Sequence, residues 1–240
     1  MRHPGHGRLT PAAFVPVDEF HRDVAAVALR AAGRHGFALG GGNALIAHGI
    51  ISRPTEDVDL FTNEDDGVQA AAGAVGDALR AAGYEAERRD TAGGLADVFY
   101  GMGDGLAEWI VTGPDGAQMM LQMAYFDRGR RPVTMDVGPV LDLEDVIGSK
   151  VCALASRVEP RDYVDTAAAL GRYTVVQLIG LARRLDPGLT ERDFADAGRQ
   201  LDRMPDRLFA RYGLSPADVA AMRDRFQDWP RRHETPPPAR

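Results

Sequence analysis

The stretch FALGGGNALIAHGIISRPTEDVDLF, residues 37–61, contains the two features that decide the fold of this 240-residue chain. A run of three glycines lies near its start, and two aspartates, Asp57 and Asp59, lie near its end. The pattern predicts a strand, a glycine turn, a short helix over residues 43–49 and a second strand, DVDLF. Alternating strands and helices of this kind favour a mixed α/β or α+β architecture.

Asp57 and Asp59 are expected to lie on one face of the second strand, because successive side chains of a strand point to opposite faces. Two neighbouring carboxylates repel each other unless something positive lies between them. Mg²⁺ prefers hard oxygen ligands and often binds one or two carboxylates together with substrate phosphates. The pair therefore predicts a metal site, and the alternative is an acidic edge strand without a ligand.

The glycine run predicts an anion site beside this pair. Glycine has no Cβ, so the backbone amides of Gly40, Gly41 and Gly42 can approach a phosphate closely. The following helix would point its N-terminus at the same place, with Asn43 as a candidate cap, and helix N-termini favour anions. Gly41, Gly42 and Asn43 are thus the predicted triphosphate cradle, and the alternative is an ordinary glycine-rich turn.

Four elements together, GGNAL, RPTEDVDLF, Lys150 and RDYVD at 161–165, resemble the nucleotidyltransferases related to DNA polymerase β. Within that group they are similar to the AbiEii-type nucleotidyltransferase toxins of abortive-infection and toxin–antitoxin systems. The resemblance covers residues 37–170. It implies an α+β fold, with a polymerase-β-like nucleotidyltransferase core built on a mixed β-sheet and followed by a C-terminal helical region.

The same resemblance implies a reaction: Mg²⁺-dependent transfer of a nucleotide from an NTP to an acceptor hydroxyl, with pyrophosphate leaving. Asp57 and Asp59 would hold the metal, which neutralises charge on the triphosphate. The resemblance also implies an RNA acceptor such as the 3′ end of tRNA, and a cognate antitoxin protein as partner.

Lys150 is the only lysine among 28 basic residues, and a compact ammonium can pair with triphosphate oxygens as a point charge. Asp165 would be about 22 Å away on one straight helix, but Pro160 breaks the pattern and lets a second helix fold back. By the resemblance, Asp165 orients or deprotonates the attacking hydroxyl, with Asp162 as second candidate, and Arg161 contacts the nucleotide. The alternative is a set of surface salt bridges on an exposed helix.

One position departs from the family pattern. The polymerase-β-like fold usually carries a third carboxylate on a strand beside the metal pair, and the matching strand here, MMLQMAYF at 119–126, presents Gln122 instead. A neutral amide contributes no charge, so a second metal would be held less tightly. This departure keeps open nucleotide binding without catalysis. Transfer to a small-molecule hydroxyl, as in antibiotic nucleotidyltransferases, also stays open, because the acidic N-terminal half suits a cationic acceptor.

The chain is expected to divide into a flexible N-terminus at 1–15, a nucleotidyltransferase core at 16–138, a helical domain at 139–230 and a disordered tail at 231–240. The helical domain would carry Lys150 and the 161–165 element. Short strands are expected at 84–89, 95–100, 108–112 and 117–126, the last two as a hairpin around a TGPDG turn.

Composition limits the remaining possibilities. The hydrophobic fraction of 45% and the charged fraction of 26% are ordinary for a soluble globular protein, and no run reaches the length of a membrane span. With no signal-peptide pattern and Cys152 as the only cysteine, we expect a cytoplasmic protein without a membrane partner. Arginines are dense over 183–211, which indicates either a solvated helical face or a surface for RNA phosphates.

Overall fold

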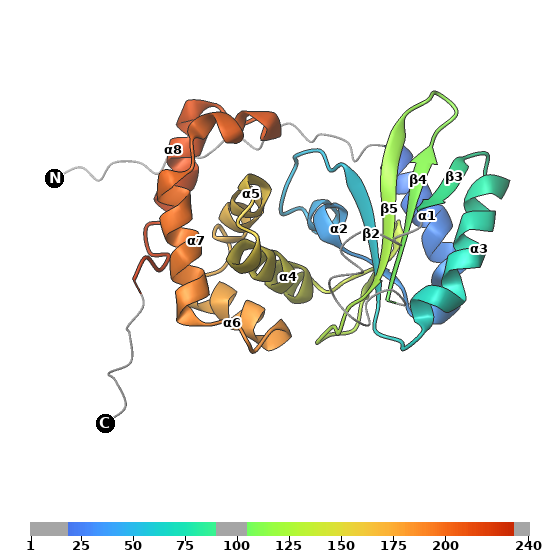
Figure 1. Cartoon of the computed structure of the whole chain (residues 1–240), viewed down its shortest axis with the longest axis horizontal. Helices are drawn as coiled ribbons and strands as arrows, with labels where there is room; N and C mark the ends of the chain where they lie inside the picture. Colours follow the sequence, from blue (N-terminus) through green and yellow to red (C-terminus); the bar gives the residue numbers. More distant parts are fainter. Residues whose placement is uncertain (1–18, 90–104, 233–240) are drawn as a thin grey trace.

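The computed structural model describes residues 19–89 and 105–232, which form a sheet half and a helical half (Figure 1). The sheet half is built on seven strands in the order β3-β4-β5-β2-β1-β7-β6, with parallel and antiparallel neighbours. The strands are β1 (Ala38–Leu39), β2 (Asp57–Thr62), β3 (Glu85–Arg89), β4 (Leu106–Thr112), β5 (Gln118–Tyr125), β6 (Val133–Met135) and β7 (Gly138–Val140). The mixed sheet confirms the expected fold class.

Strand β2 lies in the middle of the sheet, parallel to β5 and antiparallel to β1. Its side chains alternate as predicted: Val58 and Leu60 are fully buried, whereas Asp57 and Asp59 point to the opposite face. Strands β4 and β5 form the expected antiparallel hairpin. The aspartate pair therefore lies at the centre of the sheet, where neighbours on both sides fix its position.

Three helices belong to the sheet half: α1 (Glu19–Ala32), α2 (Gly41–Ala47) and α3 (Gly67–Ala81). Helices α1 and α3 pack on each other and cover the apolar face of the sheet, on the side away from the C-terminal helices (Figure 1). The short helix α2 packs against β2 and against the helical half. The carboxylate face of β2 is consequently turned toward the junction between the two halves.

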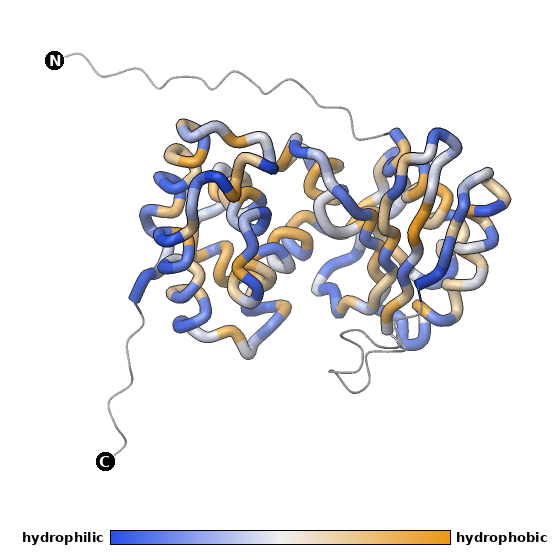
Figure 2. The backbone as a smooth tube through the Cα atoms, turned by 45° about the horizontal axis from the view of Figure 1, so that its top comes forward, coloured by the Kyte–Doolittle hydropathy of each residue, from blue (hydrophilic) through white to orange (hydrophobic). Residues whose placement is uncertain are grey.

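The helical half is formed by α4 (Leu143–Ser156), α5 (Pro160–Ala169), α6 (Val175–Leu185), α7 (Glu191–Arg203) and α8 (Pro216–Arg225). Three of these helices begin with a side-chain cap: the side chains of Asp142, Thr174 and Ser215 accept hydrogen bonds from backbone amides in the first turns of α4, α6 and α8. Hydrophilic segments lie mainly on the outside of both halves, as Figure 2 shows.

A buried aromatic cluster holds the helical half together. Its members are Tyr163, Phe194, Phe226 and Trp229, all at most 2% exposed, with ring centroids 5.3–6.3 Å apart in the contacting pairs. The Tyr163 hydroxyl donates to the Ala197 carbonyl at 2.7 Å. Because Tyr163 belongs to α5, this cluster fixes the helix that also carries Asp162 and Asp165.

Several boundaries differ from the sequence expectations. Strands β6 and β7 were not predicted, because three residues are too few to show an alternating pattern. Of the expected tail at 231–240, residues 231 and 232 are described, and Arg231 pairs with Asp202 at 3.0 Å. The expected strand at 95–100 and the N-terminus at 1–15 lie outside the described residues. The domain boundary at residue 139 stays a prediction; in the part of the chain that the structure describes, the sheet ends at Val140 and helices follow.

Within the described ranges, no helix is both long and apolar enough to cross a membrane.

Candidate active site

A cavity lies at the junction of the two halves, in front of the carboxylate face of β2. Segments far apart in the sequence form its wall: the start of α2, the loop before β2, helices α4 and α5, and the turn after α7. Its lining residues are Gly42, Arg53, Pro54, Thr55, Glu56, Asp57, Asp59, Lys150, Arg161, Arg211 and Tyr212. Six of the predicted site residues are thus brought together: Gly42, Asp57, Asp59, Lys150, Arg161 and, through its contact with Lys150, Asp165.

The two aspartates form the acidic side of this cavity. Burial raises the pKa of Asp59, the charge of Lys150 opposes that rise, and the charge of Asp57 adds to it. Burial likewise raises the pKa of Asp57, opposed first by the charge of Arg161. Each carboxylate is therefore partly stabilised by a cation of the helical half. The pKa of both groups still stays raised, so the pair favours binding of a proton or a cation.

Gly41 lies against Asp59, and the reason glycine is needed there is visible in the backbone. Its φ of +58° is in the left-handed region, and a Cβ at this position would overlap the Asp59 carboxylate. Gly40 is similarly close to the Phe61 ring. The glycine run thus brings the backbone at Gly41 into close contact with the Asp59 carboxylate.

The expectation that Asn43 caps its helix is wrong. Helix α2 begins two residues earlier, with Gly40 in the N-cap position, and the Asn43 side chain is 5% exposed. Its Nδ2 donates to the Asp57 carbonyl at 2.7 Å, and its Oδ1 accepts from the Thr55 hydroxyl at 3.0 Å. Asn43 therefore braces the loop that leads into β2, and its contact with nucleotide stays a prediction.

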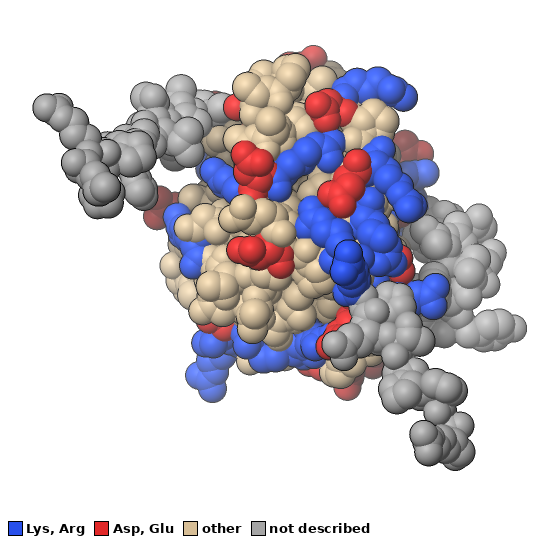
Figure 3. Space-filling view, turned by 90° about the vertical axis from the view of Figure 1, so that its left-hand side faces the viewer, with Lys and Arg blue, Asp and Glu red and all other residues tan. Residues whose placement is uncertain are grey.

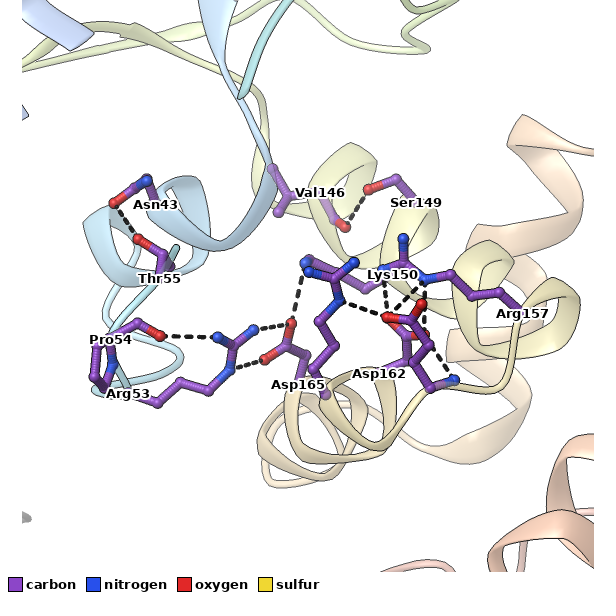
Figure 4. A network of polar contacts seen from close by, with 12 residues as sticks. Asn43, Arg53, Pro54, Thr55, Val146, Ser149, Lys150, Arg157, Asp162 and Asp165 are labelled. Carbon is purple, nitrogen blue, oxygen red and sulfur yellow. Dashed lines mark hydrogen bonds and ion pairs between the residues drawn. The ribbon is translucent and has the colours of Figure 1, made fainter. Parts of the chain in front are cut away.

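Asp165 lies between the two halves and binds a cation from each (Figure 4). Arg53, from the loop before β2, donates from Nε to Oδ1 and from Nη2 to Oδ2, both at 2.8 Å. Lys150 Nζ lies 3.0 Å from Oδ2. The expectation that the break before α5 brings Lys150 and Asp165 together is confirmed.

Asp162 occupies a different place, one turn away on α5. Its carboxylate binds Arg157 through two hydrogen bonds of 2.8 and 3.0 Å and accepts from the Glu159 amide at 3.2 Å, closing the N-terminal turn of the helix. Its side chain is fully buried and does not line the cavity. Because Asp162 and Asp165 are both buried, the alternative of surface salt bridges on an exposed helix is wrong for these two residues.

Arg53, Arg211 and Tyr212 were not recognised in the sequence as site residues. The Arg53 guanidinium lies 5.7 Å from the centre of the Tyr212 ring, and the Arg211 guanidinium lies 5.2 Å from it. Arg211 also reaches Glu56 at 3.2 Å across the cavity mouth. The only sequence signal for Arg53 is its position four residues before Asp57 in RPTEDVD; Tyr212 carries none.

The donor set fits a divalent cation. Carboxylate oxygens are the ligands that Mg²⁺ and Mn²⁺ prefer, and two side chains plus substrate phosphates are a common set for Mg²⁺. Among the described residues, no group of three or more His, Cys, Asp or Glu side chains forms a metal cluster. Asp57 and Asp59 would therefore hold the cation as a pair, as the sequence predicts.

Solved structures share this fold, and two of the three compared below are described as nucleotidyltransferases. A putative nucleotidyltransferase from H. pylori is 14% identical, with 87% of this chain and 92% of that chain covered and a TM-score of 0.57. The JHP933 protein of Helicobacter pylori is 15% identical (88% and 92% covered, TM-score 0.56). MenT4, a nucleotidyltransferase toxin from Mycobacterium tuberculosis, is 14% identical (87% and 82% covered, TM-score 0.56). Curated protein sequences give no match.

The fold is thus one that solved nucleotidyltransferases share. Residues 22–231 match the family described as "Nucleotidyl transferase AbiEii toxin, Type IV TA system", and the chain belongs to this family. It is a toxin-type nucleotidyltransferase, with an NTP as substrate and an antitoxin as partner, in agreement with the resemblance seen in the sequence.

The raised pKa of Asp59 predicts a pH-dependent stability. A carboxyl group with a raised pKa stabilises the fold below its ordinary value of 3.8, and this contribution is lost as the pH rises through the folded-state value. We expect Asp59→Asn to raise the melting temperature of metal-free protein near pH 7.5, by about 2–4 °C for each kcal/mol relieved. The difference should shrink as the pH falls.

Thermal unfolding in EDTA over a pH series measures this effect. The matched control is Asp77→Asn, an exposed carboxylate on α3 that should show no such pattern. A lower melting temperature for Asp59→Asn at neutral pH would mean that the ionised carboxylate stabilises the fold, contrary to this assignment.

The contact between Gly41 and Asp59 predicts a second effect. We expect Gly41→Ala to displace the Asp59 carboxylate. Nucleotide transfer should fall by at least about tenfold, because a displacement of about 1 Å at a reacting site lowers the rate strongly. Gly49→Ala is the matched control: its φ is +66°, and a Cβ there meets nothing within 4 Å. Both variants carry about 1–2 kcal/mol of backbone strain, so equal activity in the two would contradict the role of the close approach.

Proposed function

We propose that this protein transfers a nucleoside monophosphate from an NTP to a hydroxyl group of RNA, at the 3′ end of tRNA, in a Mg²⁺-dependent reaction that stops growth of the host cell. The observation that carries the proposal is the pairing, across one cavity, of two carboxylates on β2 with cations from the helical half. The family supplies the nucleotidyl-transfer class and the toxin role.

The cations are placed to bind a triphosphate. Arg53, Lys150, Arg161 and Arg211 all line the cavity that the aspartate pair also lines. Phosphate oxygens accept charge-assisted hydrogen bonds from both ammonium and guanidinium groups. In this arrangement the backbone at Gly41 and Gly42 binds one side of the triphosphate and the cations bind the other.

The reaction is an in-line displacement at the α-phosphorus. The acceptor hydroxyl loses its proton to solvent and its oxygen forms a bond to the α-phosphorus, while the bond from phosphorus to the bridging oxygen breaks and pyrophosphate leaves with that electron pair. A divalent cation between Asp57 and Asp59 supplies charge neutralisation at the phosphate oxygens when bound. Lys150 and Arg53 hold the triphosphate so that the leaving group is aligned with the incoming hydroxyl.

Asp165 acts in this scheme through the cations that it binds. Both of its oxygens are engaged by Arg53 and Lys150, at 2.8–3.0 Å. A carboxylate held in this way positions the two cations toward the cavity, and an acceptor hydroxyl reaches it only beside Lys150. We therefore assign Asp165 to orientation of the reacting groups rather than to a free base.

The helical half offers a surface for the RNA acceptor. Lys and Arg side chains gather on the face shown in Figure 3, where acidic residues are interspersed. Exposed arginines of α7 and the turn after it include Arg192, Arg203, Arg207 and Arg211, and of these Arg203 and Arg207 form no ion pair with any described residue. Phosphate contacts of this kind supply sequence-independent affinity for RNA.

Radiolabelled transfer tests the proposal directly. The protein is incubated with each labelled NTP, a divalent cation and either total tRNA or an aminoglycoside mixture, with Asp59→Ala as the inactive control. Label on tRNA supports the proposal, and label on the aminoglycoside instead assigns a small-molecule acceptor. Absence of label on both, in a protein that still binds NTP, would assign a non-catalytic nucleotide-binding role.

Growth provides an independent measurement. Expression of the wild-type chain should slow a bacterial host, and expression of Asp59→Ala at matched protein level should not. Equal growth of the two strains would count against the toxin role of the transfer reaction.

The Lys150 ammonium predicts a strict chemical requirement. A charge-assisted contact contributes about 1.5–3 kcal/mol, or roughly 10- to 150-fold, so Lys150→Ala should lower kcat/KM for the NTP by at least that factor. Lys150→Arg should not restore activity, since its planar fork must fit beside the Arg53 fork on Asp165. Steady-state kinetics of the three proteins measures this. An arginine variant with most of the activity would remove Lys150 from the site.

Substitution of the two α5 carboxylates should have different effects on activity and stability. Asp165→Asn loosens both Arg53 and Lys150, so transfer should fall strongly. Asp162→Asn removes the Arg157 pair and the first-turn hydrogen bond, which should cost about 1–3 kcal/mol of stability while the folded enzyme keeps its activity. The measurements are the transfer activity and the urea unfolding of both variants. A lower kcat in Asp162→Asn without a loss of stability would indicate that Asp162 is a catalytic residue after all.

A further inference from the structure

The residue that replaces the expected third carboxylate lies in a polar row across the sheet. Gln122 of β5 is the registered neighbour of Asp59 on β2 and of Glu108 on β4. All three side chains are half-buried and point to the face that lines the junction. The Gln122 Nε2 donates to Glu108 Oε1 at 2.5 Å, and within the described residues this is the only hydrogen bond of either side chain.

Chemistry fixes the orientation of this amide. An ionised glutamate only accepts hydrogen bonds, so the NH₂ group of Gln122 must face Glu108. The oxygen and nitrogen of a planar amide point in different directions, so the amide oxygen is not directed at the Glu108 oxygen that Nε2 binds. The neighbour of Gln122 on the other flanking strand, β2, is Asp59.

We propose that the amide oxygen of Gln122 is a third, neutral ligand of the divalent cation held by Asp57 and Asp59, and that Glu108 is the positioning residue that orients it. The inference rests on the proposed function, because it takes the aspartate pair as the metal site. Amide oxygens are hard oxygen ligands, which divalent cations such as Ca²⁺ and Mg²⁺ prefer. Outer partners of this kind orient ligands and change metal affinity by about 10- to 100-fold when removed.

This arrangement moves negative charge away from the cation. A carboxylate at 122 would add a third like charge directly beside Asp59, whereas here the carboxylate stands one strand farther away, on Glu108. The repulsion within the metal-free site is thereby lower, and the ligand oxygen is retained. The expected consequence is a weaker cation site than three carboxylates would form.

Mn²⁺ binding to nucleotide-free protein, followed by electron paramagnetic resonance of the free ion, tests the proposal without reference to activity. Gln122→Met keeps the side-chain length and removes the oxygen, and should weaken Mn²⁺ binding by about tenfold. The double variant Gln122→Glu/Glu108→Gln exchanges the two partners at constant net charge. It should bind Mn²⁺ several-fold more tightly than the wild type, because it places the charge beside Asp59.

Gln118→Met is the matched control. Gln118 lies on the same strand and face, and its Nε2 donates to the Thr112 hydroxyl of β4 at 3.2 Å in the same cross-strand arrangement. This variant should bind Mn²⁺ as the wild type does. A purely structural role of the Gln122–Glu108 pair predicts that Gln122→Met binds Mn²⁺ within about twofold of Gln118→Met, and that result overturns the inference even if the exchanged variant does not fold.

Asp59→Asn separates this inference from the proposed function. If Asp59→Asn abolishes Mn²⁺ binding while Gln122→Met leaves it intact, the aspartate pair stands and only the third ligand is rejected. If Asp59→Asn binds Mn²⁺ as tightly as the wild type, the metal pair itself is rejected, and the third ligand with it.

Discussion

The Asp165 carboxylate is fully buried at the junction of the two halves, and the geometry of the site depends on how that charge is satisfied. Taking a carboxylate out of water costs several kcal/mol, and only well-placed partners offset this. Arg53 comes from the sheet half and Lys150 from α4, so the folded state with Asp165 ionised requires both halves to be docked. The same contacts set the distance between the cationic wall and strand β2.

The opposite wall imposes a second electrostatic constraint. Asp57 and Asp59 lie on one face of a central strand, and burial raises the pKa of both. Such a pair is unfavourable in the metal-free protein, although Lys150 and Arg161 lessen its cost. Sites with perturbed carboxylates of this kind are typical of catalysis and of cation binding. The fold accepts a local loss of stability here because a bound cation and a triphosphate would recover it.

The sequence predicted the parts of this site that depend on local geometry. Alternation along DVDLF placed both aspartates on one face, and the break at Pro160 allowed Lys150 to meet Asp165. It did not predict the part played by Arg53, whose partner is 112 residues away and has no periodic relation to it. The cap expected at Asn43 is wrong because the helix begins at Gly41, after Gly40 in the N-cap position, and glycines at these positions gave no local signal of that start. A local sequence pattern contains no information on pairing between distant residues or on the exact backbone conformation of a glycine turn.

The geometry at Asp165 also gives a physical reason for a single lysine in a chain that otherwise uses arginine. Arg53 already occupies Oδ1 and Oδ2 with a two-pronged contact, which leaves the remaining acceptor capacity of Oδ2 to Lys150. A second guanidinium presents several donors in a rigid plane, more than the one acceptor site left on each carboxylate oxygen can satisfy. An ammonium needs only one such contact and can direct its other two N–H groups into the cavity. The acceptor geometry at Asp165 and the phosphate chemistry of the cavity therefore favour the same side chain at this position.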